Sequence, residues 1–134
     1  MNTAYISSFA YCRNVEHSQN QNEEDTNISL LPFYKLSAIP EYISLRAVCS
    51  IFGDNIFNNN SVRAYFKDNE GNIILQYEWF LDSHLIENAG NNIPDALIFN
   101  IALACNIEKT GIYSTAFFFN EKLIGEFYIN ISMR

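Results

Sequence analysis

Apolar and polar residues alternate along most of this chain, and alternation with period two is typical of β-strands. In the segment 42–52, Ile43, Leu45 and Ala47 begin an apolar face, while polar residues such as Ser44 and Arg46 point the other way. Similar segments predict further strands at 3–12, 27–36, 61–67, 73–80, 97–107, 112–120 and 123–131. No stretch has convincing amphipathic-helix spacing, so the pattern predicts an all-β fold.

The segments between these strands carry turn signals. Gly71, in the stretch 68–72, is suited to the positive φ of a hairpin turn, and the short link 120–122 joins the two clearest strands. The prolines Pro32, Pro40 and Pro94 stand at strand boundaries or on expected edges, where a missing N–H breaks no ladder. The polar, acidic stretch 14–26 is expected to be a mobile loop.

These elements predict one domain covering residues 1–134, an antiparallel β-sandwich of about eight strands. An immunoglobulin-like or related Greek-key topology is expected. A closed β-barrel is the alternative, because period-two alternation does not distinguish one curled sheet from two packed sheets.

Charge and cysteine content indicate which partners and which cell compartment to expect. The chain has 8 Lys and Arg against 15 Asp and Glu, a net charge of −7, which disfavours nucleic acid and anionic membranes as partners. Its three cysteines form no CxxC pair, and the N-terminal segment lacks the basic and apolar regions of a secretion signal. No apolar stretch is long enough to span a bilayer. We therefore expect a cytoplasmic protein with free thiols.

Catalytic chemistry finds little support in the sequence. Cys49 and Cys105 fall within apolar strands, where a thiol behaves as a small hydrophobic group. Cys12 has Arg13 beside it and His17 five residues further on, but this spacing alone does not define a nucleophile and base. The glycine-rich motifs that hold nucleotide phosphates are missing. We expect no cofactor and no catalytic residue.

A possible ligand site lies in the loops expected at one end of the sandwich. Asp82, His84 and Glu87 follow a strand closely, and Asp54 follows another. Carboxylate and imidazole groups can bind divalent metals, but a solvated loop is the simpler explanation of this composition. No metal site is therefore assigned, and these residues are kept as a possible end-loop ligand site.

Alternation places several apolar side chains on the outside of the predicted sandwich. Tyr65, Phe118 and Tyr128 point outward if the period is unbroken, with Ile124 beside them. The hairpin 112–133 then has apolar residues on both faces, and its outer face needs a cover. The cover is either a protein partner, including a second copy, or a segment of the same chain.

The runs 28–33 and 39–44 carry turn and strand-entry motifs that contain Pro32 and Pro40. They resemble the "S-L-I-x-P" and "I-P-x-x-x-S" strands of a family of small, uncharacterised bacterial proteins, although Leu31 departs from the first pattern. Residues 65–72 resemble its "D-x-x-G" hairpin, and Gly111 to Tyr113 its final "G-x-Y" hairpin. The resemblance covers most of the chain from Ile28 onward and implies a β-sandwich. It supplies no catalytic residue.

The leading functional hypothesis is a non-catalytic cytoplasmic binding or assembly module, which forms a homo-oligomer or binds a protein encoded in the same operon. One alternative is a small-molecule binder or enzyme that uses the end loops. Another is a phage or prophage component. Fold alone does not decide among them.

Overall fold

The computed structural model describes residues 3–17, 26–82 and 96–134, and this part of the chain forms nine β-strands. They are β1 (Ala4–His17), β2 (Thr26–Leu30), β3 (Phe33–Leu36), β4 (Glu41–Gly53), β5 (Asn60–Lys67), β6 (Ile73–Leu81), β7 (Ala96–Ile107), β8 (Gly111–Phe119) and β9 (Lys122–Met133). Within the described ranges no helix is long and apolar enough to cross a membrane.

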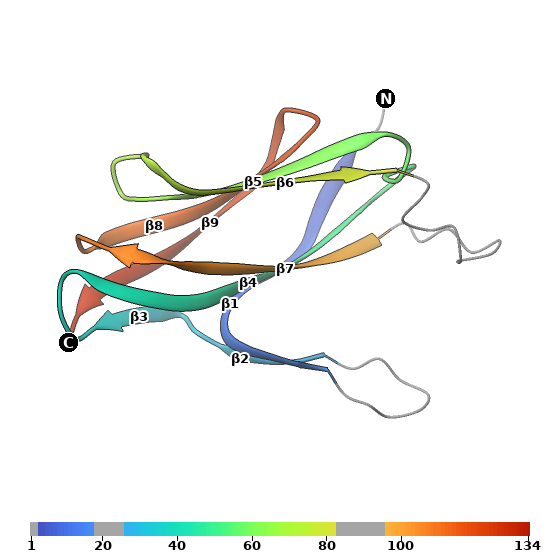
Figure 1. Cartoon of the computed structure of the whole chain (residues 1–134). Coiled ribbons are helices and arrows are strands. Elements are labelled where there is room, and N and C mark those ends of the chain that lie inside the picture. Colours follow the sequence, from blue (N-terminus) through green and yellow to red (C-terminus); the bar gives the residue numbers. More distant parts are fainter. Residues whose placement is uncertain (1–2, 18–25, 83–95) are drawn as a thin grey trace.

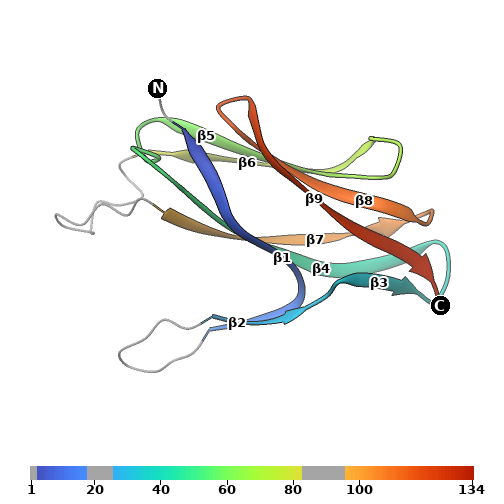
Figure 2. The same cartoon turned by 180° about the vertical axis from the view of Figure 1, so that it is seen from behind.

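The strands form two sheets stacked face to face, with the orders β2-β1-β4-β7 and β3-β9-β8-β5-β6 (Figure 1). All neighbouring strands are antiparallel except β3 and β9, which are parallel. The C-terminal end of β1 bends away from the sandwich together with β2, with which it pairs (Figure 2). Among the described strands, none of one sheet pairs with one of the other. The predicted β-sandwich is confirmed, and over the described ranges the two sheets stay separate, unlike in the alternative closed barrel.

The order of the strands is immunoglobulin-like. The pair β4-β7 corresponds to strands B and E of that fold, and β9-β8-β5-β6 corresponds to G-F-C-C′. Tyr113, near the start of β8, donates a hydrogen bond from its hydroxyl to the backbone oxygen of Lys109 at 2.7 Å. This is the position of the tyrosine corner in immunoglobulin domains. The predicted Greek-key topology is therefore also confirmed.

The core lies between the sheets and follows the predicted alternation. Odd-numbered residues of β4 and β7 and even-numbered apolar residues of β5 face inward. Phe9 of β1 stacks on Phe127 of β9 with ring centroids 4.2 Å apart, and Phe117 meets both rings edge-on. The largest fully buried side chains are Tyr113, Phe66, Phe117, Leu36, Ile43, Leu45, Ile51, Ile56, Leu81, Leu103, Ile107 and Ile129.

Two boundaries differ from the sequence prediction. The expected strand 27–36 is divided into β2 and β3, which belong to different sheets. Pro32 lies at the break, because it has no N–H for a ladder and restricts the residue before it. In addition, β1 continues to His17 and β2 begins at Thr26, so both ends of the expected loop 14–26 are strand. Residues 18–25 lie outside the described residues.

Asparagines have structural roles in two of the turns. Gly71 has the predicted positive φ, 84°, and Asn120 and Glu121 also have positive φ values, as a two-residue hairpin turn requires. The amide of Asn60 is buried and donates to the backbone oxygens of Asn55 and Ile56, both at 2.9 Å. Its Oδ1 accepts from Nδ2 of Asn120 at 2.8 Å. Asn60 therefore joins the turn after β4 to the turn between β8 and β9.

Candidate interaction surface

Three of the four predicted interface residues lie on the outer face of the five-stranded sheet. Tyr65 of β5 and Phe118 of β8 are half-buried, and their rings meet edge-to-face with centroids 5.5 Å apart. Tyr128 of β9 lies opposite Ser114 and is 63% exposed. The structure confirms that these three side chains point outward, whereas their role in an interface remains a prediction.

The fourth residue, Ile124, was predicted to point outward and does not. Gly125 pairs with Phe117, but the next pair joins Leu123 to Phe118, so a β-bulge inserts Ile124 between the two pairs. Ile124 is half-buried and packs against the core, while Leu123 is exposed. An inserted residue reverses the parity of those beyond it, which explains the error.

We use the name outer band for the apolar residues on this outer face, Phe33, Tyr65, Ile112, Phe118, Leu123 and Tyr128. They come from β3, β5, β8 and β9. Phe33 and Ile112 both lie opposite Asn130, and Phe118 lies opposite Leu123. Phe33, Ile112 and Leu123 were not predicted from the sequence. Ile112 has the same parity as Phe118, so alternation alone was a sufficient signal for it.

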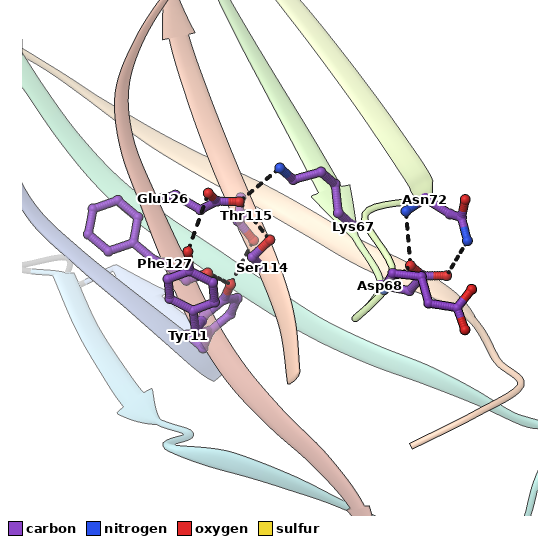
Figure 3. Close-up of polar contacts among 10 residues, drawn as sticks. Tyr11, Lys67, Asp68, Asn72, Ser114, Thr115, Glu126 and Phe127 are labelled. Carbon is purple, nitrogen blue, oxygen red and sulfur yellow. Dashed lines mark hydrogen bonds and ion pairs between the residues drawn. The ribbon is translucent and has the colours of Figure 1, made fainter. Parts of the chain in front are cut away.

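An ion pair lies in the middle of the outer band. Nζ of Lys67 is 2.8 Å from Oε2 of Glu126, and Oγ of Ser114 donates to the same oxygen at 2.9 Å (Figure 3). The hydrogen bond from Lys67 lowers the pKa of Glu126, which outweighs the opposing effect of desolvation. Together with Ile112 and Tyr128 these residues line a shallow depression of about 520 Å³. The depression thus combines apolar side chains with a compensated ion pair, and the turn after β5, with Asp68 and Asn69, completes its lining.

The inner side of the same strands is held by Tyr11 of β1. Its hydroxyl lies 2.8 Å from Oγ1 of Thr115 and donates to the backbone oxygen of Phe127 at 2.7 Å (Figure 3). Desolvation raises the pKa of Tyr11, so the phenol stays neutral. These contacts fix β8 and β9 directly beneath the outer band.

The predicted end-loop ligand site is only partly described. Asp54 is exposed just after β4, and Asp82 is half-buried just after β6. The strands β4 and β6 finish at the same end of the sandwich (Figure 1). His84 and Glu87 lie outside the described residues. Within 3–17, 26–82 and 96–134 there is no cluster of three or more His, Cys, Asp or Glu that could hold a metal ion. A ligand site at this end stays a prediction.

The three cysteines are expected to be unreactive in the native protein. Cys12, Cys49 and Cys105 are free and buried. Desolvation raises the pKa of all three thiols, that of Cys49 to about 12, so little thiolate forms near neutral pH. A thiol reagent such as DTNB should therefore react slowly with the native protein. After unfolding in urea it should react with all three thiols. Rapid reaction of one native thiol would contradict this prediction and reopen the question of a reactive cysteine.

Asp68 should make stability depend on pH in the acid range. Desolvation raises the pKa of its carboxyl, but hydrogen bonds from Asn72, Glu70 and Lys109 outweigh this effect and lower the pKa to about 2. Stabilisation by the charged Asp68 is thus complete above the pKa of the unfolded chain, about 3.9, and is lost as pH falls toward 2. Melting temperatures between pH 5 and 2 should fall more for wild type than for Asp68→Asn. Parallel curves would contradict the assignment.

Comparisons with known proteins give no family. No family model matches the chain, and no curated protein matches it. Among solved structures it is similar to an immunoglobulin-like protein from Pseudomonas aeruginosa, with 11% identity, 96% of each chain covered and a TM-score of 0.49. It is also similar to part of a β-glucosidase from Listeria innocua, with 9% identity, 98% of this chain covered and a TM-score of 0.49. This chain spans 16% of that enzyme's chain. No activity is inferred from these similarities.

Proposed function

We propose that this domain is a non-catalytic assembly module that contacts a second copy of itself, or another protein subunit, through the outer band. The observation that carries the proposal is the gathering of Phe33, Ile112, Leu123 and Tyr128, each about half exposed or more, around a compensated ion pair. Large apolar side chains with few unpaired charges are typical of the centre of protein interfaces.

The chemistry of the described residues supports the same proposal. The buried thiols have raised pKa values, which disfavours a cysteine nucleophile. Lys67 and Glu126, the charged pair in the depression, compensate one another. We further propose a cytoplasmic location, because the chain has three free cysteines, and membership of the bacterial β-sandwich family that its turn motifs resemble.

Phe118→Glu combined with Tyr128→Glu tests the outer band. If this surface mediates self-association, the two buried carboxylates should raise the dissociation constant by about tenfold or more. Size-exclusion chromatography with light scattering measures the change. Tyr128→Glu alone is the second variant, because Tyr128 is exposed and its substitution should leave the fold intact.

Gln76→Glu is the matched control. Gln76 is exposed on β6 and lies opposite Tyr65, at the margin of the same face. The control should associate as wild type does. Two results would count against the outer band as a self-association surface. One is a monomeric wild-type protein, and the other is an oligomer that persists in both Phe118→Glu/Tyr128→Glu and Tyr128→Glu.

A further inference from the structure

Strand β7 forms an open edge of the four-stranded sheet. Its twelve residues pair with β4 in an unbroken register, from Ala96 opposite Phe52 to Ile107 opposite Glu41. Within the described ranges, no strand pairs with its other side. Alternate residues of an antiparallel edge strand direct their N–H and C=O groups away from their neighbour. β7 therefore presents a row of backbone donors and acceptors to another strand.

The sequence and the register of this edge lack the features that usually prevent pairing with another chain. β7 contains no charged residue, proline or glycine, and its register shows no bulge. The other three edge strands differ: β2 has five residues, β3 has four residues with Lys35 among them, and β6 carries Glu78 and an irregularity in its register. Long, uncharged and regular edges are the ones most prone to pairing.

The side chains of β7 are also suited to a continued sheet. Phe99, Ile101 and Leu103 are buried in the core, while Ile98 on the outer face is 63% exposed. Tyr77 of β6 donates a hydrogen bond to the backbone oxygen of Ala102. A carbonyl oxygen has two lone pairs, so this contact leaves an acceptor site for an added strand.

We propose that β7 pairs antiparallel with β7 of a second copy across a two-fold axis, so that two four-stranded sheets become one. This surface lies on the other sheet from the outer band, so the proposal goes beyond the proposed function: β7 mediates self-association, and the outer band is left for another protein subunit. Two copies that each carry a charge of −7 repel one another, and a contact built on an uncharged strand adds no like-charge pair. A two-fold axis requires a self-complementary surface, which an antiparallel edge strand provides.

The pairing has two possible registers of greatest overlap. Residues directly opposite one another in a sheet point to the same face. The two-fold axis must therefore lie midway between the two copies of one residue, which is then opposite itself. For the twelve residues of β7 that residue is Ile101 or Ala102. Ala102 then lies opposite either its own copy or Asn100 of the second copy. In both registers a charge at position 102 lies near the same position of the second copy.

A charge-swap experiment tests this proposal. Wild type should be a dimer by light scattering, and Ala102→Glu and Ala102→Lys should each raise its dissociation constant by about tenfold or more. An equal mixture of the two variants should recover the dimer, because opposite charges then face one another. Ser44→Glu is the control. Ser44 belongs to β4 and lies opposite Ala104 of β7, so it is on the same outer face but one strand away from the edge.

Hydrogen exchange of the wild-type protein provides a readout that needs no substitution. Amides of 96–107 should exchange more slowly as the protein concentration rises through the dissociation constant, while those of the β6 edge do not change. A wild-type monomer at all concentrations would overturn the proposal. So would concentration-independent protection of β7, which would mean that the strand is covered within one chain. A dimer lost in Phe118→Glu/Tyr128→Glu but kept in both Ala102 variants would overturn β7 pairing and retain the proposed function.

Discussion

Replacing Phe117 with alanine is expected to lower the free energy of unfolding by about 3–5 kcal/mol. Phe117 is fully buried in β8, and its ring contacts Phe9 and Phe127, one from each sheet. The substitution removes both the burial of the ring and its packing across the sandwich, and leaves a cavity between the sheets. Urea unfolding monitored by circular dichroism measures the change.

The neighbouring residue gives the control for this prediction. Phe118 is the next residue of β8 but faces outward and is half-buried. Phe118→Ala should cost about 1 kcal/mol, because less apolar area leaves contact and solvent fills the space. Equal losses for the two variants would contradict the assignment of inner and outer faces on β8.

Replacing Asn60 with alanine is expected to cost about 2–4 kcal/mol, the second largest effect. Its buried amide makes three hydrogen bonds that join residues 55 and 56 to Asn120. Removing it leaves two backbone oxygens and the Nδ2 of Asn120 without these partners, and unsatisfied buried groups are costly. Thermal and urea unfolding measure the loss.

Asn58→Ala is the matched control, because Asn58 is exposed in the same turn. Its stability should lie within about 0.5 kcal/mol of wild type. If Asn60→Ala were equally neutral, the amide would not be the link between the two turns.

Local pattern was enough to predict most strands and their faces. Alternation gave the inward residues of β4, β5, β7 and β8, such as Ile43, Val62, Phe99 and Phe117, because burial on one side of a pleated strand imposes period two. Gly71 marked a turn for a similarly local reason, since glycine adopts positive φ without steric cost.

The failures concern properties that depend on distant residues. Leu123 and Ile124 have the reverse of their predicted orientations because of the bulge in the register between β8 and β9. Alternation within one strand carries no information about that register. Likewise, the division of 27–36 depends on which sheet each half joins. The outer band was found in part, since Tyr65, Phe118 and Tyr128 follow parity. The open edge at β7 was not found, because an edge is defined by the order of strands in space.

The parallel pairing of β3 with β9 has a consequence for synthesis of the chain. Lys35 of β3 contacts Ser132 of β9 through a hydrogen bond between residues 97 positions apart in the sequence. On the ribosome β3 therefore emerges before its partner strand, which is translated more than ninety residues later. The five-stranded sheet cannot be completed until β9 has left the exit tunnel, and until then nascent β3 lacks its partner strand.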